Sequence, residues 1–250
     1  MHIHLLTLFP EVCHPYLDTS IVGRAQKSGN LLVSVHDIRD YAADHHHVTD
    51  DTPYGGGGGM IIKPEPVFAA VESIGRRDSD KSEIILLTPQ GRLFSQDTAH
   101  ELVKLDQIIL IAGRYEGFDE RIRKYLVTDE ISVGDYVVTG GELPALMIVD
   151  AVARLIPGVL GAIGAAEKDS HGESGILEHP HYTRPVNFRG WDVPDVLLSG
   201  NHEKIANWRM KESLRRTWQR RPDLLIDTQL SEYEKEFIAE LAEESVVKWK

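Results

Sequence analysis

Three closely spaced glycines constrain the centre of this chain more than any other feature. Gly134, Gly140 and Gly141 lie in the stretch Glu130–Gly158, just before the long apolar run Ala145–Ile156. Glycine has no Cβ, so the backbone can pass close to a ligand or to another segment. The pattern predicts a strand, a tight glycine turn and a helix. Such a turn either binds a small flat ligand or only permits close packing, and the stretch alone leaves both open.

Strand-like and helix-like segments alternate in front of this stretch, which predicts an α/β domain with a largely parallel sheet. The strands are expected at Ile3–Phe9, Leu31–Ile38, Ile84–Thr88, Gln107–Ala112 and Glu130–Val133, with a further β-rich piece at Tyr136–Thr139. The helices are expected at Val12–Gly29, Pro66–Ile74, Gln96–Leu105, Asp119–Tyr125 and Met147–Ile156.

Three of the expected strands end in glycine-containing loops. These loops are Thr88–Gly91, Ala112–Gly117 and Ser132–Gly141. In open α/β sheets, ligands bind beyond the carboxyl ends of the strands. The three loops therefore predict one shared pocket at that edge, although none of them is specific alone.

A second glycine cluster has the sequence Tyr54-Gly55-Gly56-Gly57-Gly58-Gly59-Met60. It lacks the Gly-Lys-Ser/Thr end of a Walker loop, and a methionine replaces the last glycine of a dinucleotide fingerprint. It is either a flexible connector or a loop whose backbone packs closely against a ligand or a base. The adjacent histidines 45–47 lack the spacing of a metal site, and a loop touching a polyanionic partner is the better interpretation.

The overall charge of −12 argues against a general polyanion binder, but the charge is uneven. Residues 179–221 hold nine Lys and Arg against four Asp and Glu, and they include Trp191, Trp208 and Trp218. Basic residues among aromatics suit a nucleic acid with exposed bases. On spacing alone, a solvated helix face with core tryptophans is favoured.

The composition is that of an intracellular protein. Cys13 is the single cysteine, so an internal disulfide is excluded. The N-terminus reads as a strand rather than a signal peptide, and no apolar run is long enough to span a bilayer. A cytoplasmic location is therefore expected.

The chain changes character after Gly158. Residues 161–178 are rich in Gly, Ala and Ser and are expected to form a flexible linker or lid. Helices are expected at about Glu203–Arg221 and Glu232–Lys248. The expected organisation is thus an α/β domain over 1–160, a linker over 161–178 and a small helical domain over 179–250.

The sequence closely resembles the bacterial tRNA (guanine-N1)-methyltransferases of the TrmD family over essentially its whole length. The resemblance rests on nine ordered motifs: Leu8-Phe9-Pro10, the 54–60 glycine loop, Leu87-Thr88-Pro89-Gln90-Gly91, residues 112–117 (AGRYEG), residues 131–136 (ISVGDY), Gly140-Gly141-Glu142-Leu143-Pro144, Arg154-Leu155-Ile156-Pro157-Gly158, residues 179–185 (HPHYTRP) and Leu198-Ser199-Gly200-Asn201-His202.

The resemblance implies a SPOUT-type domain with a deep trefoil knot, which general topology rules would have excluded. It implies that the knot binds S-adenosylmethionine. Carried over position by position, the cofactor-binding residues are Leu87, Pro89, Gly91, Gly113, Tyr115, Glu116, Ile131, Ser132, Val133, Gly134, Tyr136, Val138, Gly140, Gly141 and Pro144. Val138 departs from the leucine that is frequent in the family, and Thr88 and Thr139 stand where serine is frequent.

The resemblance also implies the reaction, which is methylation of N1 of guanine 37 in tRNA, beside the anticodon. It gives Asp169 as the general base and Arg154 as the residue that stabilises O6. From the residues alone, Asp169 reads as a linker acid and Arg154 as a costly charge within an apolar helix. The substrate-binding residues implied are Gly58, Gly59, His181, Ser199, Gly200, Asn201, His202 and Arg209.

The family further implies a symmetric homodimer with shared active sites, and assistance by Mg²⁺ at a position that the sequence does not indicate. Two other interpretations stay open. One is a SPOUT methyltransferase acting on a different RNA site, and the other is a non-catalytic RNA-binding protein with a relic cofactor pocket.

Overall fold

The computed structural model describes residues 1–76, 81–161, 164–226 and 228–247, without the side chains of 244–247. The chain divides into two compact units, Met1–Ile163 and Gly164–Lys250. Each unit is considered by itself. Within the described residues, no helix combines the length and the apolar character needed to cross a membrane.

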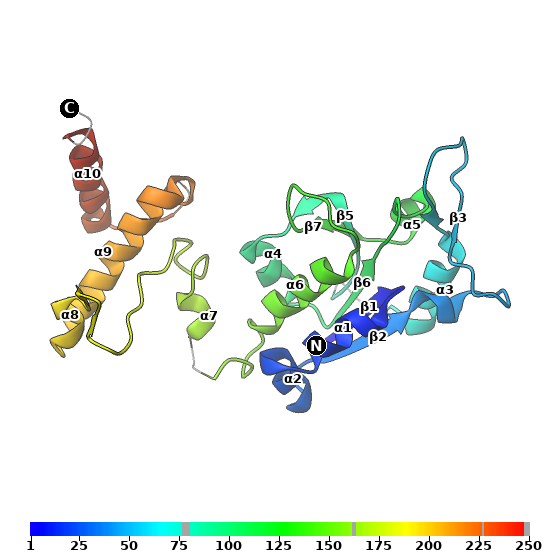
Figure 1. Ribbon diagram of the computed structural model, residues 1–250, viewed down its shortest axis with the longest axis horizontal. Coiled ribbons are helices and arrows are strands. Elements are labelled where there is room, and N and C mark those ends of the chain that lie inside the picture. The colour runs from blue at the N-terminus through cyan, green and yellow to red at the C-terminus, as the bar shows by residue number, and fades with distance from the viewer. Residues whose placement is uncertain (77–80, 162–163, 227, 248–250) are drawn as a thin grey trace. The chain divides into compact units, whose positions relative to one another are not determined.

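The first unit is built on a five-stranded parallel sheet (Figure 1). Its order is β2-β1-β6-β5-β7, and the strands are β1 (His2–Thr7), β2 (Leu32–Asp37), β5 (Ser82–Leu93), β6 (Gln107–Ala112) and β7 (Asp129–Ser132). All its strand pairs are parallel, which confirms the predicted sheet. A separate small antiparallel pair joins β3 (Asp50–Asp51) to β4 (Ile61–Ile62).

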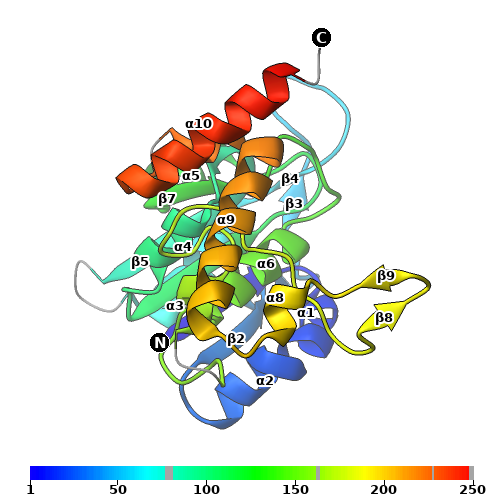
Figure 2. The same ribbon diagram turned by 90° about the vertical axis from the view of Figure 1, so that its left-hand side faces the viewer.

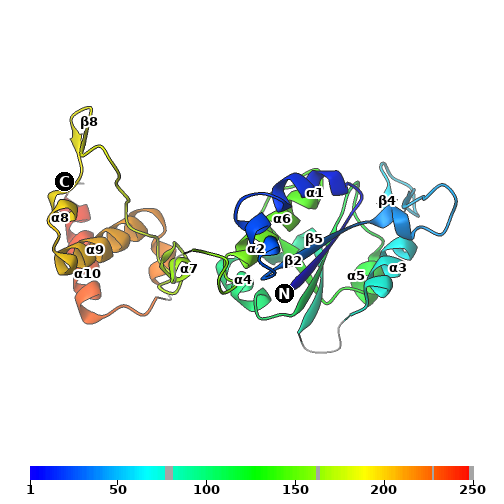
Figure 3. The ribbon, with the colours of Figure 1, turned by 90° about the horizontal axis from the view of Figure 1, so that it is seen from below.

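Helices cover both faces of this sheet (Figure 3). One layer comprises α1 (Pro10–Leu17), α2 (Ser20–Lys27), α4 (Gln96–Leu102) and α6 (Glu142–Ala153), and the other comprises α3 (Pro64–Ile74), α5 (Glu120–Tyr125) and the 3₁₀ helix η1 (Ile38–Tyr41). Strand β6 is buried along its whole length, with Ile108 and Leu110 in the first core and Ile109 and Ile111 in the second. A strand covered on both faces has this continuous apolar sequence.

The expected single helix over Val12–Gly29 is wrong, because the chain turns between α1 and α2. Thr19 is extended and Ser20 has a φ of 53°. Gly23 then packs directly on the end of α1, where an added Cβ would lie 2.6 Å from the carbonyl carbon of Asp18. Glycine at this position therefore serves the close approach of two helices, a role that its sequence neighbours do not reveal.

Strand β5 also departs from the expectation, since it continues beyond Thr88 to Leu93. Its pairing with β7 shifts register, because Leu87 and Arg92 both pair with Ile131. The residues between them form a bulge at the carboxyl end of the sheet. The Thr88–Gly91 loop is therefore an interruption within a strand and not the end of one.

The β-rich piece Tyr136–Thr139 is not a strand. It belongs to an irregular loop between β7 and α6, and its side chains are exposed. Among the described residues, no strand pairs with this segment, so the β propensity of Tyr and Val does not produce a strand here.

The second unit is small and mostly helical (Figure 2). It contains α7 (Ala165–Lys168), the hairpin β8 (Asn187–Phe188) and β9 (Trp191–Asp192), α8 (Asp195–Leu198), α9 (His202–Arg220), η2 (Pro222–Leu225) and α10 (Glu232–Val247). Its core is formed by Leu214 of α9 with Phe237 and Leu241 of α10. The two long helices lie where they were expected, and Lys248 falls outside the described residues.

A buried carboxylate joins three elements of the first unit. Glu142, at the start of α6, is 1% exposed. It accepts a hydrogen bond of 2.6 Å from the hydroxyl of Thr7 on β1, and it pairs at 3.0 Å with Nε of Arg114 in the loop after β6. The guanidinium of Arg114 in turn lies 4.5 Å from the ring centre of Phe9. A negative charge at a helix N-terminus is also favoured by the helix dipole.

We expect Arg114→Ala to lower the free energy of unfolding by about 3 kcal/mol, because it leaves the buried Glu142 without its cation. Urea unfolding followed by far-UV circular dichroism measures this. Arg121→Ala is the matched control, since Arg121 forms an exposed ion pair with Asp119 and its removal should leave the midpoint nearly unchanged. Equal midpoints for the two variants would contradict the role given to Arg114.

Candidate functional site

A cavity of about 350 Å³ lies at the carboxyl edge of the sheet. This volume falls in the range of small-molecule sites. The cavity is bounded by the β5 bulge, the loop after β6 and the loop between β7 and α6, which are the three glycine loops of the sequence. Their placement at one edge matches the ligand position general for open α/β sheets.

Close backbone packing brings the second and third loops together. The amide of Gly141 donates to the carbonyl of Gly113 at 2.8 Å. A Cβ on Gly141 would lie 2.7 Å from Cα of Ala112, and a Cβ on Gly113 would overlap the ring of Phe118. Both glycines are therefore required by packing, and they leave bare backbone on the cavity wall.

Gly140 connects the cavity to the buried carboxylate. A Cβ on Gly140 would overlap Nε of Arg114 and lie 2.5 Å from Oε2 of Glu142. Nη1 of Arg114 also donates to the carbonyl of Thr139 at 3.4 Å. The Arg114–Glu142 pair thus lies directly against the glycine turn and fixes its position.

The start of the third loop is shaped by Gly134 and Ser132. The hydroxyl of Ser132 donates to the carbonyl of Gly134 at 3.0 Å. Gly134 has a φ of 157°, and a Cβ there would overlap the ring of Tyr136. The Tyr136 ring consequently packs over the loop backbone, with its hydroxyl 3.3 Å from the carbonyl of Val133.

The structure brings together nearly all the residues carried over as cofactor-binding. All of them except Gly91 line this one cavity. A Cβ on Gly91 would overlap the backbone of Glu130 and Ile131, so this glycine permits the contact between β5 and β7. Val138 and Thr139, which depart from the family pattern, both line the cavity.

Two arginines and a phenylalanine also line the cavity, although the sequence did not predict them as site residues: Arg114, Phe118 and Arg123. Arg123 pairs with Glu130 at 2.7 Å and with Glu120 at 2.9 Å. Although burial opposes it, hydrogen bonding to Glu130 raises the pKa of Arg123. Arg114 lies within the motif of residues 112–117, but its role becomes visible only through its ion pair with Glu142 in the folded structure.

The second glycine cluster lies beside the same loops. The amide of Glu116 donates to the carbonyl of Met60 at 3.1 Å. Gly59 has a φ of 83°, and a Cβ there would lie 2.6 Å from Oε1 of Glu116. Gly58 and Gly59 are exposed. The segment is therefore anchored at its end to the loop after β6.

Arg154 does not interrupt a buried helix face, contrary to the interpretation from the residues alone. Helix α6 ends at Ala153, and Arg154 is its exposed C-cap residue. Because the side chain is exposed, its charge is not withdrawn from water and carries no desolvation cost. A cation at a helix C-terminus is also favoured by the helix dipole. Its side chain is exposed at the surface of the first unit.

Asp169 belongs to the second unit, where it is the C-cap residue of α7 and partly buried. The amide of Gly172 donates to its carbonyl at 2.9 Å. The segment around it contains a short helix and hydrogen-bonded turns.

The remaining carried-over residues lie at two places in the second unit. His181 and Arg209 line a cavity of about 390 Å³. Ser199, Gly200, Asn201 and His202 form the exposed turn into α9. Oδ1 of Asn201 accepts from the amide of Lys204 at 3.0 Å and caps the helix. This motif thus has a local structural role whatever it binds.

Comparison with known proteins gives a consistent result. The sequence profile described as "tRNA (Guanine-1)-methyltransferase TrmD" matches residues 1–227. A tRNA (guanine-N(1)-)-methyltransferase of Dehalococcoides mccartyi is 55% identical over 246 residues, covering 98% of this chain and 99% of the relative. A protein of the same name from Anoxybacillus flavithermus is 53% identical, covering 95% of this chain and 97% of the relative. Another from Bacillus subtilis is 52% identical, covering 98% of this chain and 100% of the relative. With cavity, glycine loops and sequence in agreement, the chain belongs to the TrmD family of tRNA (guanine-1)-methyltransferases.

Proposed function

We propose that this protein transfers a methyl group to N1 of a guanine in tRNA, at position 37 beside the anticodon. The observation that supports this proposal most directly is the glycine-walled cavity. It lies in a chain whose relatives, aligned over nearly their full length, are named tRNA (guanine-N(1)-)-methyltransferase. Acting on tRNA, the enzyme would work in the cytoplasm.

S-adenosylmethionine is the methyl donor in this proposal. The cavity suits such a ligand because Gly113, Gly140 and Gly141 leave it bare backbone where side chains would otherwise stand. Leu87, Ile131 and Pro144 add apolar surface for a flat base. When bound, the cofactor supplies an electrophilic methyl group on a sulfonium.

The trefoil knot of the family is part of the proposal. It is supported by the way the loop between β7 and α6 returns to the loop after β6, through the hydrogen bond from Gly141 to Gly113. A knotted path would enclose the cavity with backbone from three loops. Such a wall would need little rearrangement to accept the cofactor.

The target guanine presents a chemical difficulty that the protein must solve. N1 carries a proton and is a poor nucleophile until that proton is removed. We assign its removal to the carboxylate of Asp169, and the stabilisation of negative charge developing on O6 to the guanidinium of Arg154. The partial burial of Asp169 and the exposure of Arg154 at a helix end are compatible with these roles.

The proposed working unit is a homodimer in which two copies share each active site. Helices α1 and α6 contact each other and carry exposed apolar side chains, Val12 and Tyr16 on the first and Leu143 and Met147 on the second. An exposed apolar surface of this kind favours association with another protein surface.

In the part of the chain that the structure describes, no cluster of three or more His, Cys, Asp or Glu side chains matches the oxygen ligands of the Mg²⁺ implied by the family. Among the described residues, the group of side chains spaced to share an ion is Glu178, His179 and His181. Imidazole nitrogens do not suit Mg²⁺, which prefers oxygen ligands. No step of the proposed reaction is therefore derived from Mg²⁺.

Methyl transfer from labelled S-adenosylmethionine to tRNA transcripts tests the proposed activity. We expect incorporation into a transcript with guanine at position 37 and none into the same transcript with adenine there. Mapping the label to another nucleotide would instead favour a SPOUT enzyme for a different RNA site. Absence of cofactor binding by calorimetry would favour the non-catalytic RNA-binding alternative.

We expect Asp169→Ala to lower the rate of methyl transfer by about 10²- to 10⁴-fold, the range typical of a lost general base. Cofactor affinity should be unchanged, because Asp169 lies outside the cavity-bearing unit. Glu167→Ala is the matched control, as Glu167 is an exposed carboxylate in the same short helix. Single-turnover kinetics measure both, and a normal rate for Asp169→Ala would refute the assignment.

A further inference from the structure

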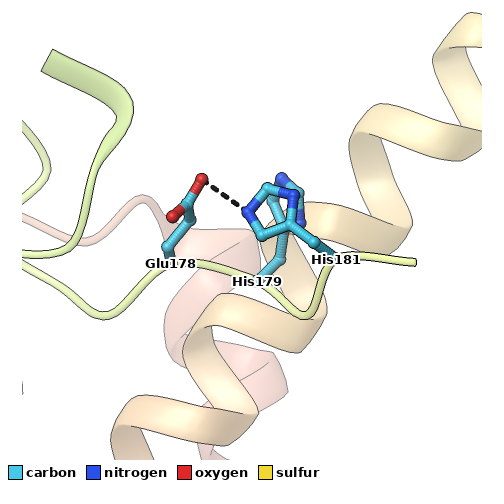
Figure 4. Close-up of side chains that lie close together, drawn as sticks. All are labelled: Glu178, His179 and His181. Carbon is cyan, nitrogen blue, oxygen red and sulfur yellow. Dashed lines mark ion pairs between the residues drawn. The ribbon is translucent and has the colours of Figure 1, made fainter. Parts of the chain in front are cut away.

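A cluster of metal-ligating side chains lies in the second unit, whereas the cavity proposed for the cofactor belongs to the first. Glu178, His179 and His181 each offer one ligand atom, and these atoms all lie within 4.8 Å of one another. Figure 4 shows the three side chains gathered on one extended segment, with Nε2 of His181 2.7 Å from Oε1 of Glu178. His181 is also one of the residues carried over as substrate-binding, whereas Glu178 and His179 have no assigned role in the proposed methyl transfer.

The backbone of the cluster is held against the rest of its unit. The amide of Leu177 donates to the hydroxyl of Thr217 at 3.0 Å, and Thr217 is fully buried. Arg216 donates to the carbonyl of Glu178 at 3.2 Å, and the Glu178 amide donates to the hydroxyl of Ser170 at 3.0 Å. The three side chains therefore start from a fixed backbone, which reduces the entropy lost when they bind a common ligand.

The tautomer of His179 is set by its neighbour. Its Nδ1 lies 3.1 Å from the carbonyl oxygen of Pro180, which can only accept, so Nδ1 carries the proton. The lone pair of Nε2 is then available, the arrangement common in metal-binding histidines.

We propose that Glu178, His179 and His181 form a binding site for a divalent transition-metal ion, for which Zn²⁺ is the best match. Two imidazoles and one carboxylate make up a recognised zinc ligand set, with the fourth position open to water. Ligand bonds of about 2.0–2.2 Å require the donor atoms to move closer together. His181 is exposed, and Glu178 is only partly buried, so both side chains have room to rotate.

Electrostatics set a limit on the affinity. Arg209 lines the same cavity of about 390 Å³ as His179 and His181, and its positive charge opposes a bound cation. The carboxylate of Glu178 offsets that charge and would exchange its ion pair with His181 for a bond to the metal. Removing the Glu178 charge should therefore weaken binding even if its oxygen atoms stay in place.

The exposed histidines 45–47 are the obvious competing site. The ring centres of His45 and His46 lie 5.2 Å apart, edge to face. Nδ1 of His47 forms a hydrogen bond of 2.8 Å with the carbonyl oxygen of Arg39. The variant His45→Ala/His46→Ala removes this competitor and leaves the proposed cluster untouched. It serves as the matched control.

The test uses the full-length chain after treatment with EDTA, titrated with Zn²⁺ by calorimetry in excess Mg²⁺. We expect one equivalent to bind, with affinity at least about tenfold weaker in His181→Ala and in Glu178→Gln. The histidine 45 and 46 variant should bind as the unaltered chain does. Unchanged circular dichroism and urea midpoints in each variant would show that folding is intact.

A second readout locates the ion independently. The ring of Trp208 lies 6.5 Å from that of His179, so Cu²⁺ at the cluster should quench its fluorescence, and Trp208→Phe should remove most of that quenching. The proposal is overturned if Zn²⁺ does not bind, if Mg²⁺ displaces it, or if binding survives in both cluster variants. Loss of binding in the histidine 45 and 46 variant would equally overturn it.

Discussion

The buried carboxylate of Glu142 is the interaction on which the first unit most depends. A carboxylate withdrawn from water is costly unless it is paired and hydrogen-bonded. Here Thr7 supplies a hydroxyl from β1, Arg114 supplies a cation from the loop after β6, and the start of α6 supplies the favourable end of a helix dipole. The same contact therefore fixes the position of α6 relative to the sheet and of the glycine turn relative to both.

The cavity follows from this arrangement together with the missing side chains of the glycines. Gly140 lies against the Arg114–Glu142 pair, and Gly141 lies against the backbone after β6. A larger residue at either position would displace the pair or separate the loops. The bare backbone on the cavity wall is thus a consequence of close packing, and it also suits the proposed cofactor. The two roles first considered for the glycine turn, packing and ligand binding, are compatible in one site.

Much of the sheet could be predicted because its signals are local. The segment Gln107–Ala112 contains the continuous apolar run Ile108–Ala112 and forms a strand with the expected bounds. The bulge in β5 depends on pairing with β7, which is distant in the sequence, and it was missed. The break at Ser20 was missed as well. The exposure of Arg154 was also missed, because helix α6 ends at Ala153, three residues before the expected end at Ile156.

The candidate site shows the same division between local and tertiary signals. The glycine loops could be grouped because parallel strands place their carboxyl ends at one edge. The packing role of Gly91 and the pairing of Arg114 could not be seen, since both depend on residues far away in the sequence. The roles of Asp169 and Arg154 come from family resemblance, and they remain predictions of the proposed mechanism.

The proposed cofactor site depends on the glycine turn that the Arg114–Glu142 pair holds in place. The most direct measurement is the affinity for S-adenosylmethionine of Gly140→Ala, by calorimetry, with Gly161→Ala as control because a Cβ there meets nothing within 4 Å. An overpacking cost of about 1–3 kcal/mol at the turn predicts an affinity loss of roughly tenfold or more for Gly140→Ala and none for the control. Equal affinities in a folded Gly140→Ala protein would contradict the account.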